Sequence, residues 1–359
     1  FNYNLPRELI SQYPLKERDS ARLLVLNRRE QTIAHRIFRD IPEYLDKDDL
    51  IVLNNTKVLA ARLKGARTTG GEVEVLLLKQ KNGLTPPFVE SIGLKRRAGL
   101  TFEALVKPAR IKLGEKIIFT PLETMDKQER DKMSLTGFNG AKTSGVINAK
   151  NEITFQAEDL ASIYNLGAMP LPPYIKRNPE DLDNIYYQTV YAHEEGAIAS
   201  PTAGLHFTKE LMEKISSSGI NIAYITLHVG YATFKPVKVE DITRHKMEPE
   251  YFKVPGETSQ LIEKARRDKI KICAVGTTSL RVLETYASGA KEGYTDLFVY
   301  PGYKFKLVDY LLTNFHLPRT TLFMLVCAFA GEGLIKRAYQ EAIDKKYRFY
   351  SYGDAMLIV

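Results

Sequence analysis

The chain has 359 residues, of which 44% are hydrophobic and 26% are charged, and its formal net charge is +8. This length suits two domains or one elaborated domain, and the composition is that of an ordinary globular protein. No apolar run approaches the roughly 20 residues that span a bilayer, and residues 1–18 carry no secretory signal, so we expect a cytoplasmic protein without a membrane segment.

Short strands and turns alternate in residues 1–63. Apolar runs predict strands at 23–26, 33–36 and 50–53. The last of these is followed by Asn-Asn-Thr at 54–56, which indicates a turn after a buried strand.

Residues 64–155 have a different pattern. Strands are predicted at 72–78, 102–106 and 117–119, with turns between them and no long helix. Short, closely spaced strands are typical of a small all-β barrel. This segment has 16 basic and 10 acidic residues, so it carries +6 of the net charge of +8. Such an excess serves solubility, or it serves a polyanionic partner such as nucleic acid.

A stiff segment follows the predicted barrel. Three of the four residues at 170–173 are proline, which excludes a helix or a central strand. The segment leads to Tyr174, with Lys176 and Arg177 close behind it. We interpret it as a rigid linker that returns to the main domain and that can also present Tyr174 to a substrate.

The stretch 196–229 is the one around which the rest of the chain is organised. His206 precedes a predicted helix whose N-cap is Thr208, and a predicted strand at 220–227 ends in His228. In open α/β sheets, ligands bind at the carboxyl ends of strands and at helix N-termini. We therefore expect both histidines to face the same crevice.

Helices and strands alternate after this stretch. Helices are predicted at 258–267 and 280–287 and strands at 271–275 and 296–300, which favours a mainly parallel sheet covered by helices. The turn Gly-Thr-Thr-Ser at 276–279 opens the second helix. Backbone N–H groups of such a turn can bind a carboxylate or ribose hydroxyls.

The C-terminal part adds a third histidine. The sequence DYLLTNFHLP begins at Asp309 and contains His316. Both cysteines, Cys273 and Cys327, lie in apolar runs, which favours buried thiols in a reducing compartment. The aromatic residues at 347–352 can stack on bases, although such residues more often close a core.

The residue inventory favours acid–base chemistry over other mechanisms. The six histidines are scattered singly, no His-x-x-x-His or Cys-x-x-Cys pair occurs, and Gly-x-Ser-x-Gly is absent, so we expect neither a metal site nor a nucleophile elbow. Three histidines with Asp309 and Tyr174 suit proton transfer at neutral pH. For each single histidine, a structural role remains the alternative.

Long motifs carry a resemblance to a known family. They include PLPPYIKR, IASPTAGLHFT, ITLHVG, AVGTTSLRVLE, LLTNFHLPRTTLFMLVCAFAG and YRFYSYGDAMLI, together with VLNNTKVLAARLKG near the N-terminus. These resemble the S-adenosylmethionine:tRNA ribosyltransferase-isomerase family over nearly the whole chain. The resemblance implies a barrel-like α/β main domain at 1–63 and 156–359, with mainly parallel strands, interrupted by a small β-barrel domain at 64–155.

The resemblance also implies a reaction in queuosine biosynthesis. The ribosyl part of S-adenosylmethionine is transferred and isomerised onto 7-aminomethyl-7-deazaguanine at the tRNA wobble position, giving epoxyqueuosine-tRNA, adenine and methionine. S-adenosylmethionine is then a consumed substrate, and we expect no cofactor and no metal. We expect a monomer that binds tRNA in a salt-sensitive way.

This chemistry suggests roles for particular residues. The sulfonium acidifies the 5′ carbon of the ribose, a base removes a proton there, and adenine leaves with the help of protonation. We hypothesise that His206 and His228 transfer protons and that His316 with Asp309 orients the substrate. The residues expected to bind substrate are Tyr174, Thr202, Gly204, Thr277, Thr278 and Asn314, and those expected to contact tRNA are Lys176, Arg177, Arg281 and Arg319.

Two alternatives from other classes remain open at this point. A non-catalytic RNA-binding protein on the same scaffold would bind tRNA without releasing adenine. A small-molecule methyltransferase would produce S-adenosylhomocysteine, although the chain lacks a glycine-rich nucleotide loop.

Overall fold

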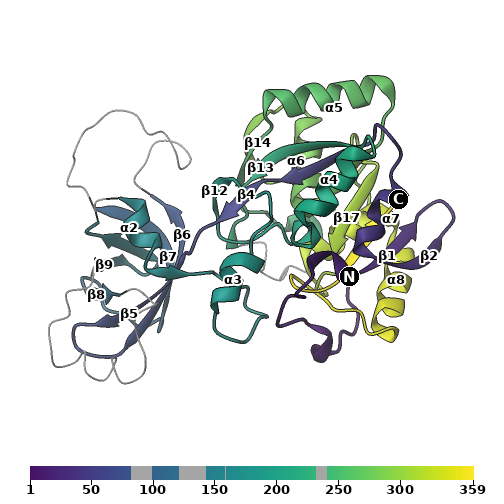
Figure 1. Ribbon diagram of the computed structural model, residues 1–359. Helices are drawn as coiled ribbons and strands as arrows, with labels where there is room; N and C mark the ends of the chain where they lie inside the picture. Colours follow the sequence, from purple (N-terminus) through teal and green to yellow (C-terminus); the bar gives the residue numbers. More distant parts are fainter. Residues whose placement is uncertain (82–98, 121–142, 158, 232–240) are drawn as a thin grey trace. The chain divides into compact units, whose positions relative to one another are not determined.

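The computed structural model describes residues 1–81, 99–120, 143–157, 159–231 and 241–359 (Figure 1). The chain separates into two compact units. The first unit contains Phe1–Lys57, Pro172–Asn178 and Ile185–Val359, and the second contains Val58–Leu171 and Pro179–Asn184. The inserted segment expected at 64–155 falls within the second unit, and its exact boundaries remain a prediction.

A nine-stranded mixed sheet forms the centre of the first unit. Its strands, in spatial order, are β16 (Glu292–Thr295), β14 (Glu250–Lys253), β13 (Asn221–Leu227), β3 (Leu50–Asn54), β15 (Ile272–Val275), β17 (Tyr310–Asn314), β18 (Ala355–Ile358), β1 (Arg22–Asn27) and β2 (Thr32–Ile37).

The main-domain prediction is confirmed only in its coarse form, as a mixed α/β unit. Of the eight neighbouring strand pairs, four are parallel, namely β13–β3, β3–β15, β15–β17 and β18–β1. The other four are antiparallel. Within the described ranges no pairing joins β16 to β2, so the strand order is open. The barrel-like, mainly parallel arrangement is therefore not confirmed.

Both faces of this sheet are buried at its central strands β3, β15 and β18, whereas the edge strand β2 is half-buried or exposed. Along β3, Leu50 and Val52 belong to one hydrophobic cluster, and Ile51 and Leu53 belong to the other. This alternation follows from the two-residue period of a strand. Because each face must be covered, the strands read as continuous apolar runs.

Helices supply the covering layers (Figure 1). Side chains of α5, α6, α7 and α8 join the first cluster, and side chains of α4 and the 3-10 helix η3 join the second. The helices of the first unit are η3 (Phe38–Tyr44), η5 (Thr202–His206), α4 (Lys209–Ser217), α5 (Gly256–Asp268), α6 (Gly276–Tyr286), α7 (Thr321–Ala330) and α8 (Glu332–Asp344), with short 3-10 turns η1 (Arg7–Leu9), η2 (Arg18–Ser20) and η7 (Ile242–Arg244). Most of α3 (Asp181–Tyr186) belongs to the second unit. A separate ribbon pairs β4 (Thr56–Val58) with β12 (Glu194–Ala197).

The second unit contains the predicted all-β barrel. Six antiparallel strands close on themselves through the pairing of β5 with β8, and β11 adds to β5. The elements are β5 (Arg62–Arg67), β6 (Glu72–Gln80), β7 (Leu100–Lys107), β8 (Lys116–Phe119), β9 (Thr143–Ala149), β10 (Glu152–Phe155), α2 (Leu160–Tyr164) and β11 (Gly167–Ala168).

Glycine at position 65 permits the barrel to close. Gly65 is paired with Phe119 across the closing strands. A Cβ at this position would lie 2.7 Å from the carbonyl oxygen of Ile118, which is closer than packed atoms approach.

No helix in the described parts of the chain is both long enough and apolar enough to cross a membrane.

Candidate functional site

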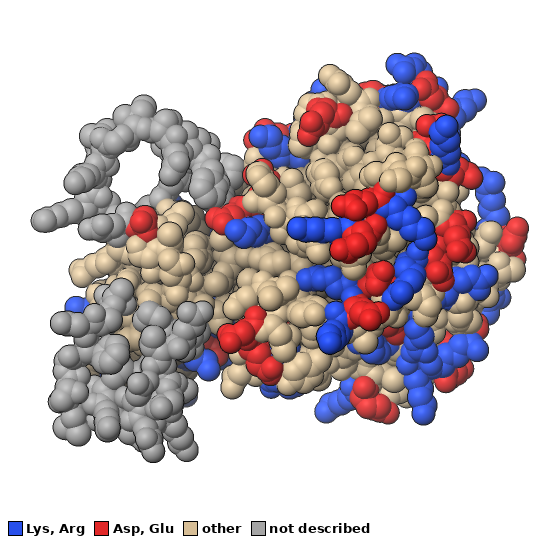
Figure 2. Space-filling view, viewed as in Figure 1, with Lys and Arg blue, Asp and Glu red and all other residues tan. Residues whose placement is uncertain are grey.

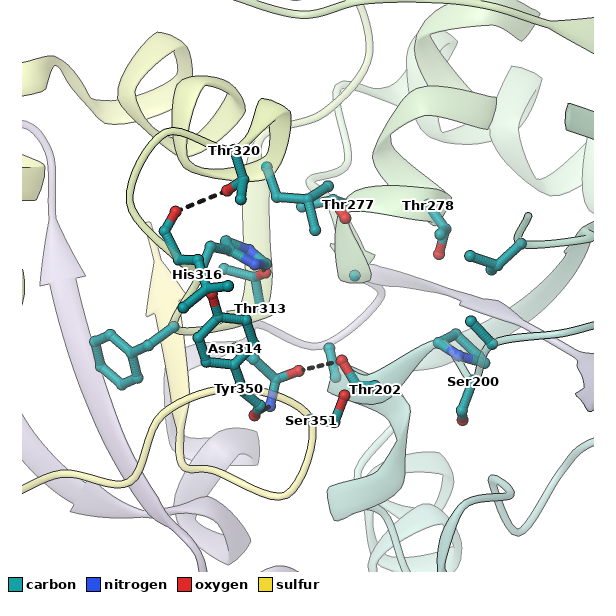
Figure 3. A pocket seen from close by; sticks show the side chains of 18 of the residues that line it. Ser200, Thr202, Thr277, Thr278, Thr313, Asn314, His316, Thr320, Tyr350 and Ser351 are labelled. Atoms are coloured by element: carbon teal, nitrogen blue, oxygen red, sulfur yellow. Dashed lines mark hydrogen bonds between the residues drawn. The ribbon is translucent and has the colours of Figure 1, made fainter. Parts of the chain in front are cut away.

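A pocket opens in the first unit where β15 and β17 end and where α6 and α7 begin (Figure 3). The pocket is partly open to solvent. This is the place where parallel strands deliver ligand-binding side chains. The polar residues that line it are Tyr174, Ser200, Thr202, Thr277, Thr278, Thr313, Asn314, His316, Thr320, Tyr350 and Ser351.

His316 is the predicted histidine that lines this pocket. It lies just beyond the end of β17, and its Nε2 is 2.8 Å from the hydroxyl of Thr313. Its backbone is held as well, because its N–H donates to the Tyr339 hydroxyl and its carbonyl accepts from the Tyr3 hydroxyl. Burial lowers the pKa of His316 to about 3. The ring is therefore neutral at pH 7.

His206 reaches the pocket through one intermediate side chain. It ends η5, its ring lies 4.9 Å from that of Phe38, and its Nε2 is 3.2 Å from Nδ2 of Asn314. The Asn314 carbonyl oxygen accepts from the Thr202 hydroxyl at 2.8 Å, so the amide group donates to His206. This arrangement places the imidazole proton of His206 on Nδ1. Burial lowers its pKa to about 4.

His228 lies outside the lining of this pocket, although the next residue, Val229, belongs to it. Its Nδ1 is 2.8 Å from the Thr56 hydroxyl, and its ring stacks on Tyr251 at 5.5 Å. A Cβ at Gly196 would lie 2.8 Å from the ring, so glycine there allows the close packing. Burial lowers the pKa of His228 to about 4.

The three histidines are thus distributed rather than gathered. One lines the pocket, one contacts it through Asn314, and one packs between β4 and β14. The expected convergence of His206 and His228 on one crevice does not appear in these contacts. Which ring transfers protons remains a prediction.

Asp309 lies apart from the pocket. It precedes β17, whereas Asn314 and His316 lie at the other end of that strand. Its carboxylate accepts from Lys271 Nζ at 3.1 Å and from the Ile272 N–H at 3.0 Å. The structure therefore does not bring Asp309 together with His316, and its contacts are those of a residue that ties two strands together.

The other predicted substrate-binding residues lie in or next to the pocket. Tyr174, Thr202, Thr277, Thr278 and Asn314 line it. Gly204 lies in η5, where a Cβ would approach the Tyr191 hydroxyl to 2.0 Å, so its role there is to permit packing.

The predicted tRNA contacts differ in accessibility. Lys176 and Arg319 are exposed, and Arg177 places its guanidinium 4.3 Å from the centre of the Tyr13 ring. Arg281 is only 3% exposed and forms an ion pair with buried Glu250. A guanidinium enclosed in this way cannot reach a phosphate without unfolding of its surroundings, so the position of Arg281 argues against its predicted contact with tRNA.

The Arg281–Glu250 pair holds the chain beyond His228. Glu250 accepts the Gly230 N–H at 2.8 Å, and Arg281 donates to the carbonyl oxygens of Leu297 and Thr295.

On the face drawn in Figure 2, Lys and Arg side chains of the first unit are interspersed with Asp and Glu.

Several lining residues escaped the sequence-based prediction. Ser200, Thr313, Thr320, Tyr350 and Ser351 all face the pocket. The signal for Ser200, Thr313 and Thr320 was present, since each lies within a motif that also contains a predicted site residue. Tyr350 comes from the aromatic run interpreted as core, and its φ of 74° turns the chain in a way that no composition pattern reveals.

Metal ligands do not gather in the part of the chain that the structure describes. No group of three His, Cys, Asp or Glu side chains there lies close enough to hold an ion. Independence from metal remains a prediction.

Acid is expected to destabilise the first unit through the three buried histidines. An imidazole in the unfolded chain titrates near 6.5, whereas the folded pKa values are about 4 for His206 and His228 and about 3 for His316. Between these limits the unfolded chain binds more protons, so the free energy of unfolding falls as the pH falls from about 6.5 to about 4. Urea unfolding at stepped pH measures this. The variant His316→Gln should show a shallower dependence, and an unchanged slope would contradict the assignment.

Comparison with known proteins shows which family the chain resembles. The queuosine biosynthesis protein family matches residues 1–358. S-adenosylmethionine:tRNA ribosyltransferase-isomerases from Sulfurihydrogenibium sp. and Aquifex aeolicus are 50% and 46% identical, and each alignment covers 100% of this chain and 98% of the relative. A crystal structure of S-adenosylmethionine tRNA ribosyltransferase from Thermotoga maritima is 35% identical with a TM-score of 0.53, covering 100% of this chain and 99% of that one. The chain therefore belongs to the queuosine biosynthesis protein family.

Proposed function

We propose that the protein is an S-adenosylmethionine:tRNA ribosyltransferase-isomerase. It transfers and isomerises the ribosyl moiety of S-adenosylmethionine onto 7-aminomethyl-7-deazaguanine at the tRNA wobble position, giving epoxyqueuosine-tRNA, adenine and methionine. The observation that carries this proposal is the 50% identity over the full chain to a relative of that name. The pocket supports it, because its lining of hydroxyls, one amide and one imidazole suits a polar nucleoside.

His316 is the group best placed for proton transfer. Of the three candidate histidines, it is the one that lines the pocket, and its ring is neutral at pH 7 because burial lowers its pKa to about 3. The reaction begins with removal of a proton from the carbon next to the sulfonium, and a neutral imidazole can accept it. Thr313 fixes the ring through its hydrogen bond to Nε2.

The other histidines act in this proposal through their neighbours. His206 accepts from the Asn314 amide, and Asn314 in turn orients the Thr202 hydroxyl, so His206 positions two lining residues. His228 fixes the end of β13 beside Val229 through its contacts with Thr56 and Tyr251. Tyr174 lines the pocket 4.2 Å from the ring centre of Tyr350 and offers an aromatic surface to a base.

The tRNA must present a single base to this pocket. A wobble base in an anticodon loop is single-stranded and can be turned out at low cost. Exposed Lys176 and Arg319 are candidates for backbone contacts, as is Arg177. We propose a cytoplasmic monomer with no resident cofactor.

One product analysis tests the proposal. Incubation with S-adenosylmethionine and precursor-modified tRNA should release adenine and methionine in equal amounts, together with modified tRNA. A non-catalytic RNA-binding protein would release neither product, and a methyltransferase would release S-adenosylhomocysteine. Chromatography separates all of these compounds, and either alternative product pattern would refute the proposal.

A further inference from the structure

Two α-helices begin at the pocket, and they differ in whether a side chain accepts a hydrogen bond from the backbone N–H groups of the first turn. In α7 the hydroxyl of the N-cap residue Thr320 accepts from the Phe323 N–H at 3.3 Å. In α6 the N-cap is Val275, whose side chain makes no capping hydrogen bond, and the first turn contains no acidic residue. The first N–H groups of a helix have no partner within the helix. Those of α6 therefore need a partner from elsewhere.

The first turn of α6 faces the pocket. Gly276, Thr277 and Thr278 all line it, and each is buried in the protein. Gly276 follows β15 directly with a φ of 87°, a conformation that glycine adopts without strain. Its missing side chain leaves the start of the helix open, with the Thr278 hydroxyl oxygen 3.4 Å from where a Cβ would lie.

Two buried hydroxyls that line the pocket have no partner among the described residues. They are the side-chain oxygens of Thr278 and Ser200, whose residues are 8% and 6% exposed and which both line the pocket. Buried hydroxyls in folded proteins are almost always hydrogen-bonded. One of the two unpaired hydroxyls lies in the first turn of α6 and the other lies elsewhere in the lining of the same pocket. Together with the uncapped N–H groups of α6, they indicate a ligand group that accepts hydrogen bonds.

The charge of that group follows from the helix. The N-terminus of a helix carries a partial positive charge and binds anions. No Asp, Glu, Lys or Arg is among the described residues that line the pocket, so this partial charge is uncompensated. Of the groups in the substrate named above, S-adenosylmethionine contains a single anion, which is the α-carboxylate of its methionine moiety.

We propose that the N-terminus of α6, with the hydroxyls of Thr278 and Ser200, binds the α-carboxylate of S-adenosylmethionine. This inference rests on the proposed function and assigns an orientation to its substrate. Figure 3 shows Thr278 and Ser200 on one side of the pocket and His316, Thr313 and Tyr350 on the other. With the carboxylate at α6, the sulfonium and the ribose extend toward His316, where the proton must be removed.

Decarboxylated S-adenosylmethionine tests the inference, because it keeps the sulfonium and the nucleoside and lacks the carboxylate. Initial rates of adenine release at saturating precursor tRNA give kcat/KM for both compounds. The wild-type protein should prefer S-adenosylmethionine by about 10- to 100-fold, as expected for hydrogen bonds to a charged group. Thr278→Val, which removes the hydroxyl and keeps the shape, should narrow this preference by about 5-fold or more.

Two further variants separate binding from folding. Thr278→Ser retains the hydroxyl and should restore the preference. Thr285→Val is the matched control on the same helix, because the Thr285 hydroxyl bonds to the Arg281 carbonyl and to Thr295 and does not line the pocket. Its preference should equal that of the wild-type protein.

The outcomes distinguish this inference from the proposed function. Adenine release with equal kcat/KM for the two compounds would overturn the carboxylate subsite and leave the proposed function standing. A preference that Thr278→Val leaves intact would overturn the assignment to α6. Failure to release adenine from either compound would refute the proposed function and, with it, the inference.

Discussion

Replacing His316 with alanine is expected to lower kcat for adenine release by about 10²- to 10⁴-fold, the usual contribution of a positioned acid or base. His316 lines the pocket, its neutral ring can accept a proton, and Thr313 fixes its orientation. If the ring acts on the reacting carbon, the loss falls on kcat, whereas a ring that only binds substrate would change KM. Single-turnover adenine release at saturating S-adenosylmethionine and tRNA measures it.

His193→Ala is the matched control for this prediction. The His193 side chain is 83% exposed, pairs with Glu194 and does not line the pocket. Its variant should release adenine at the wild-type rate. Wild-type turnover in His316→Ala would remove His316 from the catalytic assignment and return attention to His206 and His228.

Replacing Arg281 with alanine is expected to reduce the free energy of unfolding by about 3–5 kcal/mol, because it removes one member of a buried ion pair and the Glu250 carboxylate loses the opposite charge of Arg281. The side chains of the pair are 4% and 6% exposed, and Glu250 also holds the Gly230 N–H. Urea unfolding followed by circular dichroism measures the loss. The double variant Arg281→Met with Glu250→Gln removes both charges and should recover part of it.

Arg267→Ala provides the comparison at the surface. The Arg267 side chain is 73% exposed and pairs with its neighbour Asp268, a contact of little energetic value in water. Its unfolding midpoint should match that of the wild-type protein. If Arg281→Ala were equally stable but bound tRNA more weakly, the buried-pair interpretation would be wrong and the original prediction of a tRNA contact would regain support.

The barrel was predictable because its signals are local. The strands of the second unit are short, and their neighbours in the sheet are mostly their neighbours in sequence. The sheet of the first unit lacks this property. Nothing in the apolar run 355–358 indicates that it enters the sheet antiparallel to β17 and parallel to β1, and this insertion is part of why the mainly parallel sheet is not confirmed.

Prediction of the site from the sequence was limited in the same way, by contacts between segments that are not adjacent in the chain. Asp309 and Asn314 are close in sequence but occupy opposite ends of β17, and a strand rises about 3.3 Å per residue, so only one of them can reach the pocket. Thr277 and Thr278 were predictable because the turn at 276–279 and the helix start after it are recognisable in the sequence. Asn314 was named from a motif of the resemblance. The burial that removes Arg281 from the surface depends on Glu250 of β14, which is 31 residues away along the chain, and on β16, which is the next strand after α6.

The place of β18 has a consequence for synthesis on the ribosome. This strand pairs with both β17 and β1. Residues 22–27 therefore cannot join the sheet through β18 until residues 355–358 have been synthesised. The barrel strands, in contrast, all lie within residues 62–155 and can associate while translation continues. A nascent chain arrested near residue 345 should therefore protect the barrel from protease and leave β1 open to cleavage.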